Sequence, residues 1–386
     1  MIYIIQRELP SYRIPFFISL SRTFDIKVLY SRLLNTSGTL TLPDHIFIKV
    51  KGYFPSSNPY FSYVSVMLRI FRNKPEVIIH EMSLKMLNVY LIPVLARITS
   101  SRLIWWGHGY VRTDKQGNNG IRRSIRILLH KTADASIVYS LKGKEFLTSN
   151  RIDKSSVFVA WNSVDTECMK KKMAEKTKNP TLKDAAVKNP PGVSFLFLGR
   201  LSEDKKPLFA VELFVRIAVK YPECSFHIVG GGVLENKLRE FVSKVNMPNI
   251  TFYGELTDQE TLGNVLSRCD LLISPGYLGL NVVHALAFGI PVISVKDGTE
   301  NTFHSPEAEY IENTKAFIAL GKCDPDMFEE CCIRFINERE LLREAKIAAE
   351  RSFRDISVER MICGFKQAIE YVLKNKGPEN ESAAGK

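Results

Sequence analysis

Residues 271–295 read LLISPGYLGLNVVHALAFGIPVISV, and the pattern within them indicates the class of fold. The run carries no charge and is long enough to cross a membrane. Its glycines, prolines, asparagine and histidine nevertheless oppose a transmembrane helix. Two short strand-like runs instead flank a glycine-rich loop and a segment of helical length. The stretch therefore predicts a buried strand–loop–helix–strand core around a site.

The same alternation of strand-like and helical segments continues outward along the chain. Strands are expected at residues 2–5, 26–30, 77–80, 103–106, 136–139, 157–160, 194–198, 225–229, 250–252, 271–274 and 292–295. Amphipathic helical stretches are expected at residues 59–73, 83–99, 120–132, 141–149, 206–220, 233–245, 258–267 and 280–288. This alternation predicts βαβ units and therefore an α/β protein with doubly wound parallel sheets.

The length of 386 residues suggests two domains, since a single core stops growing near ~250–300 residues. A polar stretch around residues 170–192 repeats Lys-Asn-Pro, lacks apolar periodicity and marks the natural boundary. The expected parts are an N-terminal domain, a linker, a C-terminal domain, a helix that returns to the N-terminal domain and a disordered tail. Their expected bounds are 1–180, 181–192, 193–350, 351–374 and 375–386.

The positive charge of the chain lies in its first half. Lys and Arg number 53 against 41 Asp and Glu, which gives a formal net charge of +12. Residues 1–180 hold 28 basic and 12 acidic residues, whereas residues 181–386 hold 25 and 29. A basic half of this kind fits nucleic acid, an anionic membrane or a phosphorylated substrate.

Two features favour the membrane over nucleic acid. No RNA- or DNA-binding motif is recognisable in the sequence. In residues 60–74 and 121–131, basic residues instead interleave with apolar ones, as in helices that lie on anionic membranes. A helix that packs on the core and exposes a charged face is the alternative for each stretch.

The seven cysteines and the N-terminus predict a cytoplasmic protein. No CxxC pair occurs, and scattered cysteines in a long chain are typical of a reduced compartment. Residues 1–6 lack the basic lead-in and the cleavage site of a signal peptide, so we expect a first strand there.

A first candidate site follows the strand at 194–198. Gly199 allows close approach of the backbone, and Arg200 with Lys205 or Lys206 could clamp a diphosphate. A solvated loop with ordinary surface charges is the alternative.

Two further junctions between a strand and a loop are rich in glycine. Gly230–Gly232 could present backbone N–H groups to phosphate, although a tight turn without a ligand fits equally well. The loop that contains Gly279 opens a helix, an arrangement that also suits an anion. His284 on that helix could bond a ligand hydroxyl or be an ordinary core histidine.

These motifs, in this order, resemble the family-4 (group 1) glycosyltransferases of the GT-B superfamily. The matching segments of the second half are Gly199-Arg200 with its lysine, Gly230–Gly232, Ile250–Gly254, Pro275–Ile293 and His304–Glu307. Those of the first half are residues 9–17, 105–109, 133–139 and 159–165. The resemblance implies two Rossmann-like domains that face each other across a cleft, with the acceptor on the N-terminal side and the donor on the C-terminal side.

The resemblance also implies roles for individual residues. Arg200 and Lys205 would neutralise the leaving diphosphate, with Lys206 as the alternative lysine, and His108 would face the donor sugar. A packing role at the end of a strand is the alternative for His108. The other donor-binding positions would be Gly199, Lys206, Gly230, Gly232, Gly254, Gly279, Leu280, Asn281, His284 and Glu307.

The sequence departs from the family at one place. Many members carry two glutamates eight positions apart around this loop, where this chain has Gly276 and His284. His284 could take over the contact with the nucleotide ribose, whereas Gly276 offers no side chain to the sugar. No metal is implied: Asp324-Pro-Asp326 mimics a metal-binding motif but lies where an aspartate caps a helix.

The expected function is retaining transfer of a sugar from a UDP- or GDP-sugar to a hydroxyl of a lipid-linked glycan, in polysaccharide or glycolipid synthesis. The expected location is the cytoplasmic face of a membrane, as a peripheral protein. Two alternatives remain open. One is an enzyme with a soluble acceptor, and the other is a non-catalytic GT-B protein that binds a glycan or a membrane, which Gly276 would favour.

Overall fold

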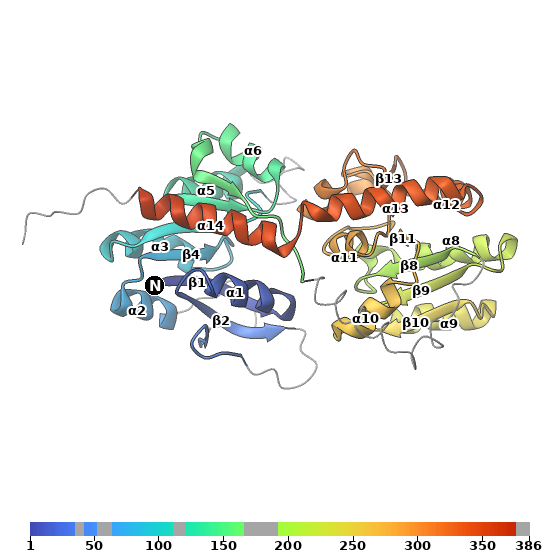
Figure 1. The fold of residues 1–386 in the computed structure, drawn as a ribbon, viewed down its shortest axis with the longest axis horizontal. Coiled ribbons are helices and arrows are strands. Elements are labelled where there is room, and N and C mark those ends of the chain that lie inside the picture. The colour runs from blue at the N-terminus through green and yellow to red at the C-terminus, as the bar shows by residue number, and fades with distance from the viewer. Residues whose placement is uncertain (35–41, 52–63, 111–119, 166–191, 376–386) are drawn as a thin grey trace, which may run out of the picture. The chain divides into compact units, whose positions relative to one another are not determined.

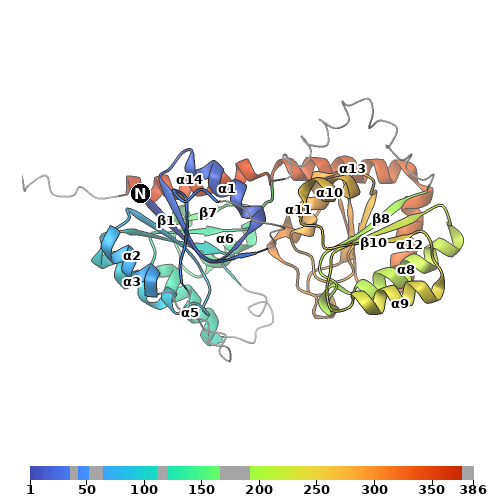
Figure 2. The ribbon, with the colours of Figure 1, turned by 90° about the horizontal axis from the view of Figure 1, so that it is seen from below.

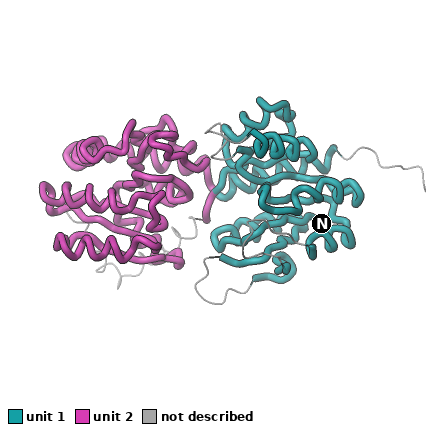
Figure 3. The backbone as a smooth tube through the Cα atoms, turned by 180° about the vertical axis from the view of Figure 1, so that it is seen from behind, with its two compact units in different colours: residues 1–162, 358–386 teal, residues 163–357 magenta. Residues whose placement is uncertain are grey.

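The computed structural model describes residues 1–34, 42–51, 64–110, 120–165 and 192–375. They form two compact units (Figures 1 and 3), of which unit 1 comprises Met1–Asn162 with Val358–Lys386 and unit 2 comprises Ser163–Ser357. Apart from Gly192, the expected linker lies outside the described residues, as does the expected tail from residue 376 onward.

Unit 1 is built on a parallel sheet of seven strands in the order β3-β2-β1-β4-β5-β6-β7. These strands are β1 (Ile2–Pro10), β2 (Ile26–Leu34), β3 (Phe47–Lys49), β4 (Val77–Glu81), β5 (Arg102–Gly107), β6 (Ala135–Val138) and β7 (Val157–Val159). The chain first adds β2 and β3 on one side of β1, and it then adds β4, β5, β6 and β7 on the other side. The strand order therefore reverses between β1 and β4.

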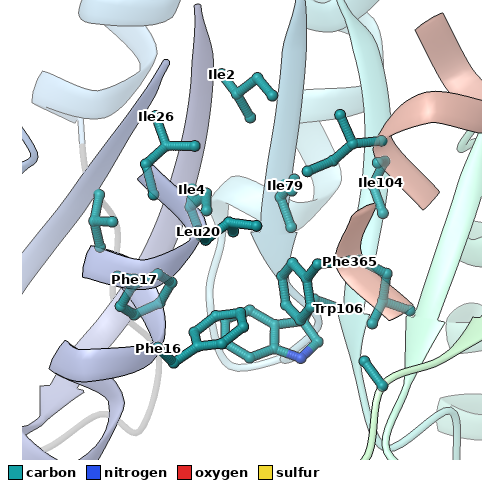
Figure 4. Close-up of a cluster of buried hydrophobic side chains, with 14 of the residues drawn as sticks. Ile2, Ile4, Phe16, Phe17, Leu20, Ile26, Ile79, Ile104, Trp106 and Phe365 are labelled. Atoms are coloured by element: carbon teal, nitrogen blue, oxygen red, sulfur yellow. The ribbon is translucent and has the colours of Figure 1, made fainter. Parts of the chain in front are cut away.

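The first face of this sheet is covered by α1 (Ile14–Ser21) and the C-terminal helix α14 (Val358–Lys374). Their aromatic side chains pack with Trp106 of β5, as Figure 4 shows. The ring centroids of Phe16 and Phe365 lie 4.9 Å apart, and those of Trp106 and Phe365 lie 4.8 Å apart. Aromatic pairs with such edge-to-face geometry add to the stability that burial of their surface provides.

The opposite face of the sheet carries α2 (Val64–Asn73), α3 (Asn88–Ile98) and α5 (Gly120–Lys131). Helix α6 (Leu141–Ser149) packs beside them on β6 and β7. Because helices cover both faces, the central strands begin with apolar runs that are buried on both sides. Tyr3, Ile4 and Ile5 of β1, for example, are all buried.

Unit 2 repeats this plan with six parallel strands in the order β10-β9-β8-β11-β12-β13. The strands are β8 (Ser194–Leu198), β9 (Ser225–Val229), β10 (Ile250–Gly254), β11 (Leu271–Ile273), β12 (Val292–Val295) and β13 (Phe317–Leu320). The helices are α8 (Pro207–Lys220), α9 (Glu235–Val245), α10 (Gln259–Leu266), α11 (Asn281–Ala287), α12 (Pro325–Asn337) and α13 (Arg339–Arg354). The strand order reverses between β8 and β11.

The uncharged stretch at 271–295 forms β11, a loop, α11 and β12, as expected from its sequence. Its strands lie in the middle of the sheet and are fully buried. Within the described residues, no helix combines the length and the apolar character that crossing a membrane requires. The two doubly wound parallel sheets confirm the predicted fold class.

Candidate functional site

The loops that follow β8 and β11 meet where the strand order of unit 2 reverses. The backbone N–H of Tyr277 donates to the carbonyl of Asp204 at 2.8 Å. The Lys205 ammonium donates to the carbonyl of Tyr277 at 2.6 Å. Open α/β sheets bind ligands at this point, outside the carboxyl ends of the strands.

Lys205 holds a charge that is poorly compensated. Its side chain is only 7% exposed, and its Nζ lies 4.4 Å from the centroid of the Tyr277 ring. Burial lowers the pKa of Lys205 from 10.5 to about 8; the charges of Asp204 and Glu307 oppose this shift, and that of Arg200 adds to it. Two neighbouring cations, one of them buried, make this loop a place where an anion would bind.

Lys206 has a different environment from Lys205. Its backbone is left-handed, with φ of 51° and ψ of 47°, at the N-cap position just before α8. Its Nζ pairs with Oε2 of Glu300 at 3.3 Å. The two lysines therefore extend toward different partners, and of the two it is Lys205 that lies against the loop after β11.

Gly276 has no room for a side chain. A Cβ atom at this position would lie 2.3 Å from the carbonyl oxygen of Asp204 and 2.6 Å from the carbonyl carbon of Lys205. Real Cβ atoms do not approach backbone this closely. The residue that replaces the glutamate of many family members is thus required by the close packing of the two loops.

A side chain at residue 279 would lie against Lys205. A Cβ atom there would lie 3.8 Å from Lys205 Nζ, 3.8 Å from Ser305 Oγ and 3.5 Å from Cε1 of Tyr277. Ser305 Oγ is buried and has no hydrogen-bond partner among the described residues. An ammonium group, a hydroxyl and an aromatic edge therefore lie around the position that a side chain at residue 279 would occupy.

The N–H groups of this loop are partly used within the loop itself. Gly279 N–H, which the sequence suggested for phosphate, donates to Oδ1 of Asn281 at 2.8 Å. The Asn281 amide in turn donates to Oγ of Ser274 at 3.4 Å. Asn281 thereby fixes the loop and begins α11, and Leu280 precedes it.

His304 links this loop to the segment after β12, a role that the sequence did not suggest. Its Nδ1 accepts from the N–H of Leu278 at 3.1 Å, so its Nε2 carries the proton and donates to the carbonyl of Val295 at 2.8 Å. The N–H of Ser305 donates back to the carbonyl of Leu278 at 3.1 Å. The segment then continues into the short helix Pro306–Tyr310, where Glu307 is buried.

His284 lies on α11 and is partly exposed. Burial lowers the pKa of its imidazole to about 4, so the ring is neutral at neutral pH. Its Nδ1 is buried without a hydrogen-bond partner among the described residues. A buried polar atom of this kind is costly unless a ligand or water satisfies it.

The glycine turn after β9 packs directly on the loop after β8. A Cβ on Gly230 would lie 1.9 Å from the carbonyl oxygen of Gly199, and one on Gly232 would lie 2.6 Å from that of Leu201. The N–H of Gly230 donates to the carbonyl of Gly254 at 2.8 Å. These glycines thus allow three neighbouring strand ends to approach one another closely.

His108 lies at the corresponding edge of unit 1. It is exposed, follows β5 directly, and its ring makes an edge contact with Tyr139 at 4.9 Å. The Tyr139 hydroxyl accepts from Arg13 at 3.0 Å, and the Arg13 guanidinium lies 4.7 Å from the Trp106 ring. Polar side chains from several strand ends therefore meet here as well.

The described residues contain no group of three His, Cys, Asp or Glu side chains arranged to hold a metal ion. Asp324 accepts hydrogen bonds from the N–H groups of Asp326 and Met327, at 3.0 and 3.1 Å. It therefore acts as the N-cap of α12.

Comparison with known proteins agrees with these features. Residues 179–352 match the family described as glycosyl transferases group 1. An uncharacterized glycosyltransferase of Methanocaldococcus jannaschii is 24% identical over 324 residues, which cover 79% of this chain and 77% of that protein.

Two solved structures share the fold over almost their whole length. The Anabaena protein HepE, solved with UDP and glucose, has a TM-score of 0.64 at 12% identity and covers 96% of this chain and 99% of its own. Sucrose-phosphate synthase of Thermosynechococcus elongatus has a TM-score of 0.66 at 13% identity, with coverages of 97% and 99%. The fold is therefore GT-B, as the sequence predicted, and residues 179–352 match the group 1 glycosyltransferases, a family of retaining enzymes that use nucleotide sugars.

Proposed function

We propose that this glycosyltransferase moves a sugar from a UDP- or GDP-sugar to a hydroxyl of a lipid-linked glycan, in the synthesis of a surface polysaccharide or glycolipid. The donor diphosphate would lie at the ends of β8 and β11. The observation that carries this proposal is the buried Lys205 ammonium, which lies beside Gly279 and against the loop after β11.

Arg200 and Lys205 would stabilise the charge that grows on the diphosphate as the bond to the sugar breaks. Donors that are already in place when this charge develops need little reorganisation, and one such donor is worth about 3 kcal/mol of barrier. The low pKa of Lys205 supports this role, because it arises mainly from burial of the charge, and an arriving diphosphate would compensate that desolvated charge. Lys206 is less suited, since its ammonium already pairs with Glu300.

Other residues of unit 2 would complete the donor site. Ser305 Oγ would bond a phosphate or sugar oxygen beside Gly279, and His284 would bond a ribose hydroxyl through its unpaired Nδ1. Glu307 would hold the charge of Lys205 in balance. The remaining positions assigned to the donor, among them Gly199, Leu280 and Asn281, would supply backbone contacts.

In unit 1, we assign His108 to the sugar or the acceptor. It is exposed at the carboxyl end of a central strand, where ligands of doubly wound sheets bind. The net positive charge of residues 1–180 suits an acceptor carried on an anionic lipid. A UDP-sugar is supported as the donor by HepE, which was solved with UDP and glucose.

The test is sugar transfer by the purified protein. Radiolabelled UDP- and GDP-sugars are mixed with a lipid extract of the source membranes, and label is counted in the organic phase. We expect one sugar nucleotide to deliver label, Arg200→Ala and Lys205→Met to abolish delivery, and Lys206→Met to retain most of it. Release of no nucleoside diphosphate from any donor would refute the proposal, and equal use of soluble acceptors would refute its lipid part.

A further inference from the structure

We propose that the outer surfaces of α2, α3 and α5 form one docking face for a bilayer that contains anionic lipids. We call this surface the α2–α3–α5 face. It is defined by the exposed side chains of residues 64–74, 85–98 and 120–131. The inference deepens the proposed function, on which it rests for the location of the acceptor, by naming the surface that meets the lipid.

Exposed apolar side chains concentrate on these three helices. Ten of the fourteen large hydrophobic side chains that are exposed within the described residues belong to the α2–α3–α5 face. They are Val64, Leu68, Phe71, Leu87, Tyr90, Leu91, Val94, Ile98, Ile121 and Leu128. Single exposed hydrophobic residues are normal, but a concentration of this kind marks an interaction site.

The spacing of these residues gives each helix an apolar outer stripe. On α3, residues 87, 91, 94 and 98 follow one another at helical spacing and are between 44% and 64% exposed. On α2, residues 64, 68 and 71 do the same. The buried side chains Val66, Ile70, Val89 and Ile92 hold the opposite sides of these two helices on the sheet. The apolar side chains of the outer stripes are therefore not the ones that pack these helices on the sheet.

The three helices lie side by side on one face of the sheet. Contacts join α2 to α3 and α3 to α5, and all three helices contribute to the same buried cluster (Figure 2). Their outer surfaces thus point away from the same side of unit 1. A broad surface of this kind can meet a flat bilayer, whereas a single stripe would suit a groove.

The charge on this face has one sign. The exposed cations are Arg69, Arg72, Lys74, Lys85, Arg97, Arg122, Arg123 and Lys131, and the ranges that define the face contain no Asp or Glu. The acidic residues that flank it are engaged elsewhere. Glu76 accepts from the N-terminal ammonium at 3.3 Å, and Asp134 pairs with Arg102 at 2.8 Å.

Apolar stripes among cations without acidic residues match an anionic lipid surface. The hydrophobic side chains would enter the headgroup region while the Arg and Lys side chains meet lipid phosphates. Phe71 and Tyr90 are aromatic residues of the kind that favour this interface. A protein partner would need acidic residues to match the cations, and its binding would not depend on lipid. Nucleic acid would match the cations but would not contact the apolar stripes favourably.

The test is sedimentation of the full-length protein with vesicles. Wild type is expected to bind vesicles of phosphatidylcholine with about 30% phosphatidylglycerol, to bind pure phosphatidylcholine weakly, and to be released as salt rises from about 0.1 to about 0.5 M. Arg122→Glu with Arg123→Glu should weaken binding at least about tenfold, since each lost cation costs about fivefold. Leu91→Ser with Val94→Ser should weaken it by about tenfold as well.

Matched controls come from unit 2. Val219 is 73% exposed on α8, and Lys237 and Lys244 are exposed on α9. Val219→Ser and the pair Lys237→Glu with Lys244→Glu should bind vesicles like wild type. Circular dichroism and the unfolding midpoint verify that every variant is folded, because the altered side chains lie outside the core.

Three results would overturn the proposal: face variants that bind as tightly as wild type, control variants that lose binding equally, or a lipid-free dimer that the face variants dissociate. An assay of nucleoside diphosphate release in detergent, where the acceptor is dissolved and no bilayer is present, tests the proposed function separately from membrane docking. Face variants should keep that activity. If no variant and no wild-type protein transfers sugar, yet vesicle binding behaves as described, the proposed function fails and the docking face stands.

Discussion

Replacing Lys205 by methionine should make the unliganded protein more stable and its nucleotide binding weaker. Methionine keeps most of the length of the side chain and removes the ammonium. The pKa of Lys205 is lowered from 10.5 to about 8, which corresponds to a penalty of about 3 kcal/mol for the buried charge. The lost hydrogen bond to the Tyr277 carbonyl offsets about 1–2 kcal/mol of this gain. The expected net stabilisation is about 1–2 kcal/mol.

The pH dependence of unfolding isolates this effect. Between pH 8 and 10.5, the unfolded state binds the proton of Lys205 and the folded state does not. The free energy of unfolding therefore rises with pH across this window because of Lys205. In Lys205→Met this contribution is absent, so the difference between the two proteins should shrink as the pH rises and change sign at about pH 9, within this window.

The assay is urea unfolding of both proteins across this window, with titration of UDP and GDP by calorimetry at neutral pH. Loss of one charged hydrogen bond to a phosphate should weaken nucleotide binding by about 1.5–3 kcal/mol. Lys206→Met is the matched control, since its exposed pair with Glu300 contributes about 0–1 kcal/mol. A variant of Lys205 that is clearly less stable at neutral pH, or that binds both nucleotides like wild type, would refute the reasoning.

Four further predictions concern neighbouring residues. Gly276→Ala should lower the unfolding temperature, because its Cβ would meet backbone at 2.3 Å and such overpacking costs about 1–3 kcal/mol. Gly279→Ala should fold normally, and its added methyl group beside Lys205 should weaken nucleotide binding in calorimetry. His284→Phe should bind UDP about tenfold more weakly while its affinity for a UDP analogue without ribose hydroxyls stays unchanged; equal losses for both would contradict the ribose contact. Glu307→Gln should lower the pKa of Lys205 further, because the carboxylate of Glu307 favours the charged lysine. The affinity for UDP should then begin to decline at a lower pH than in wild type. An unchanged pH profile would exclude the interaction between Glu307 and Lys205.

Most strands could be predicted from the sequence because they are buried on both faces. The two strands that the prediction omitted, β3 and β13, are short and lie at sheet edges. In β3 only Phe47 is buried, and in β13 no residue is, although its sequence FIAL is apolar throughout. Helix α1 was also omitted, since its sequence IPFFISLS is apolar on all sides and offers no helical periodicity.

The candidate site could be predicted only as far as its local motifs. The strand–loop motifs placed Arg200 and the lysine pair at the end of β8, but adjacent residues cannot be separated by pattern alone. The left-handed backbone of Lys206 directs the two side chains apart, and this depends on the turn into α8. Tyr277, His304 and Ser305 lie in recognised motifs but gain their contacts from segments that are distant in sequence, so the motifs alone do not reveal those contacts.

The account depends most directly on the charge state of Lys205. With lysine labelled by ¹³C at Cε, the resonance that disappears in Lys205→Met can be followed against pH, first in the free protein and then with saturating UDP or GDP. We predict a pKa of about 8 in the free protein that rises by about one unit or more when the nucleotide binds. An ordinary lysine pKa near 10.5 in the free protein, or a value that neither nucleotide changes, would contradict the claim that this lysine holds the donor diphosphate.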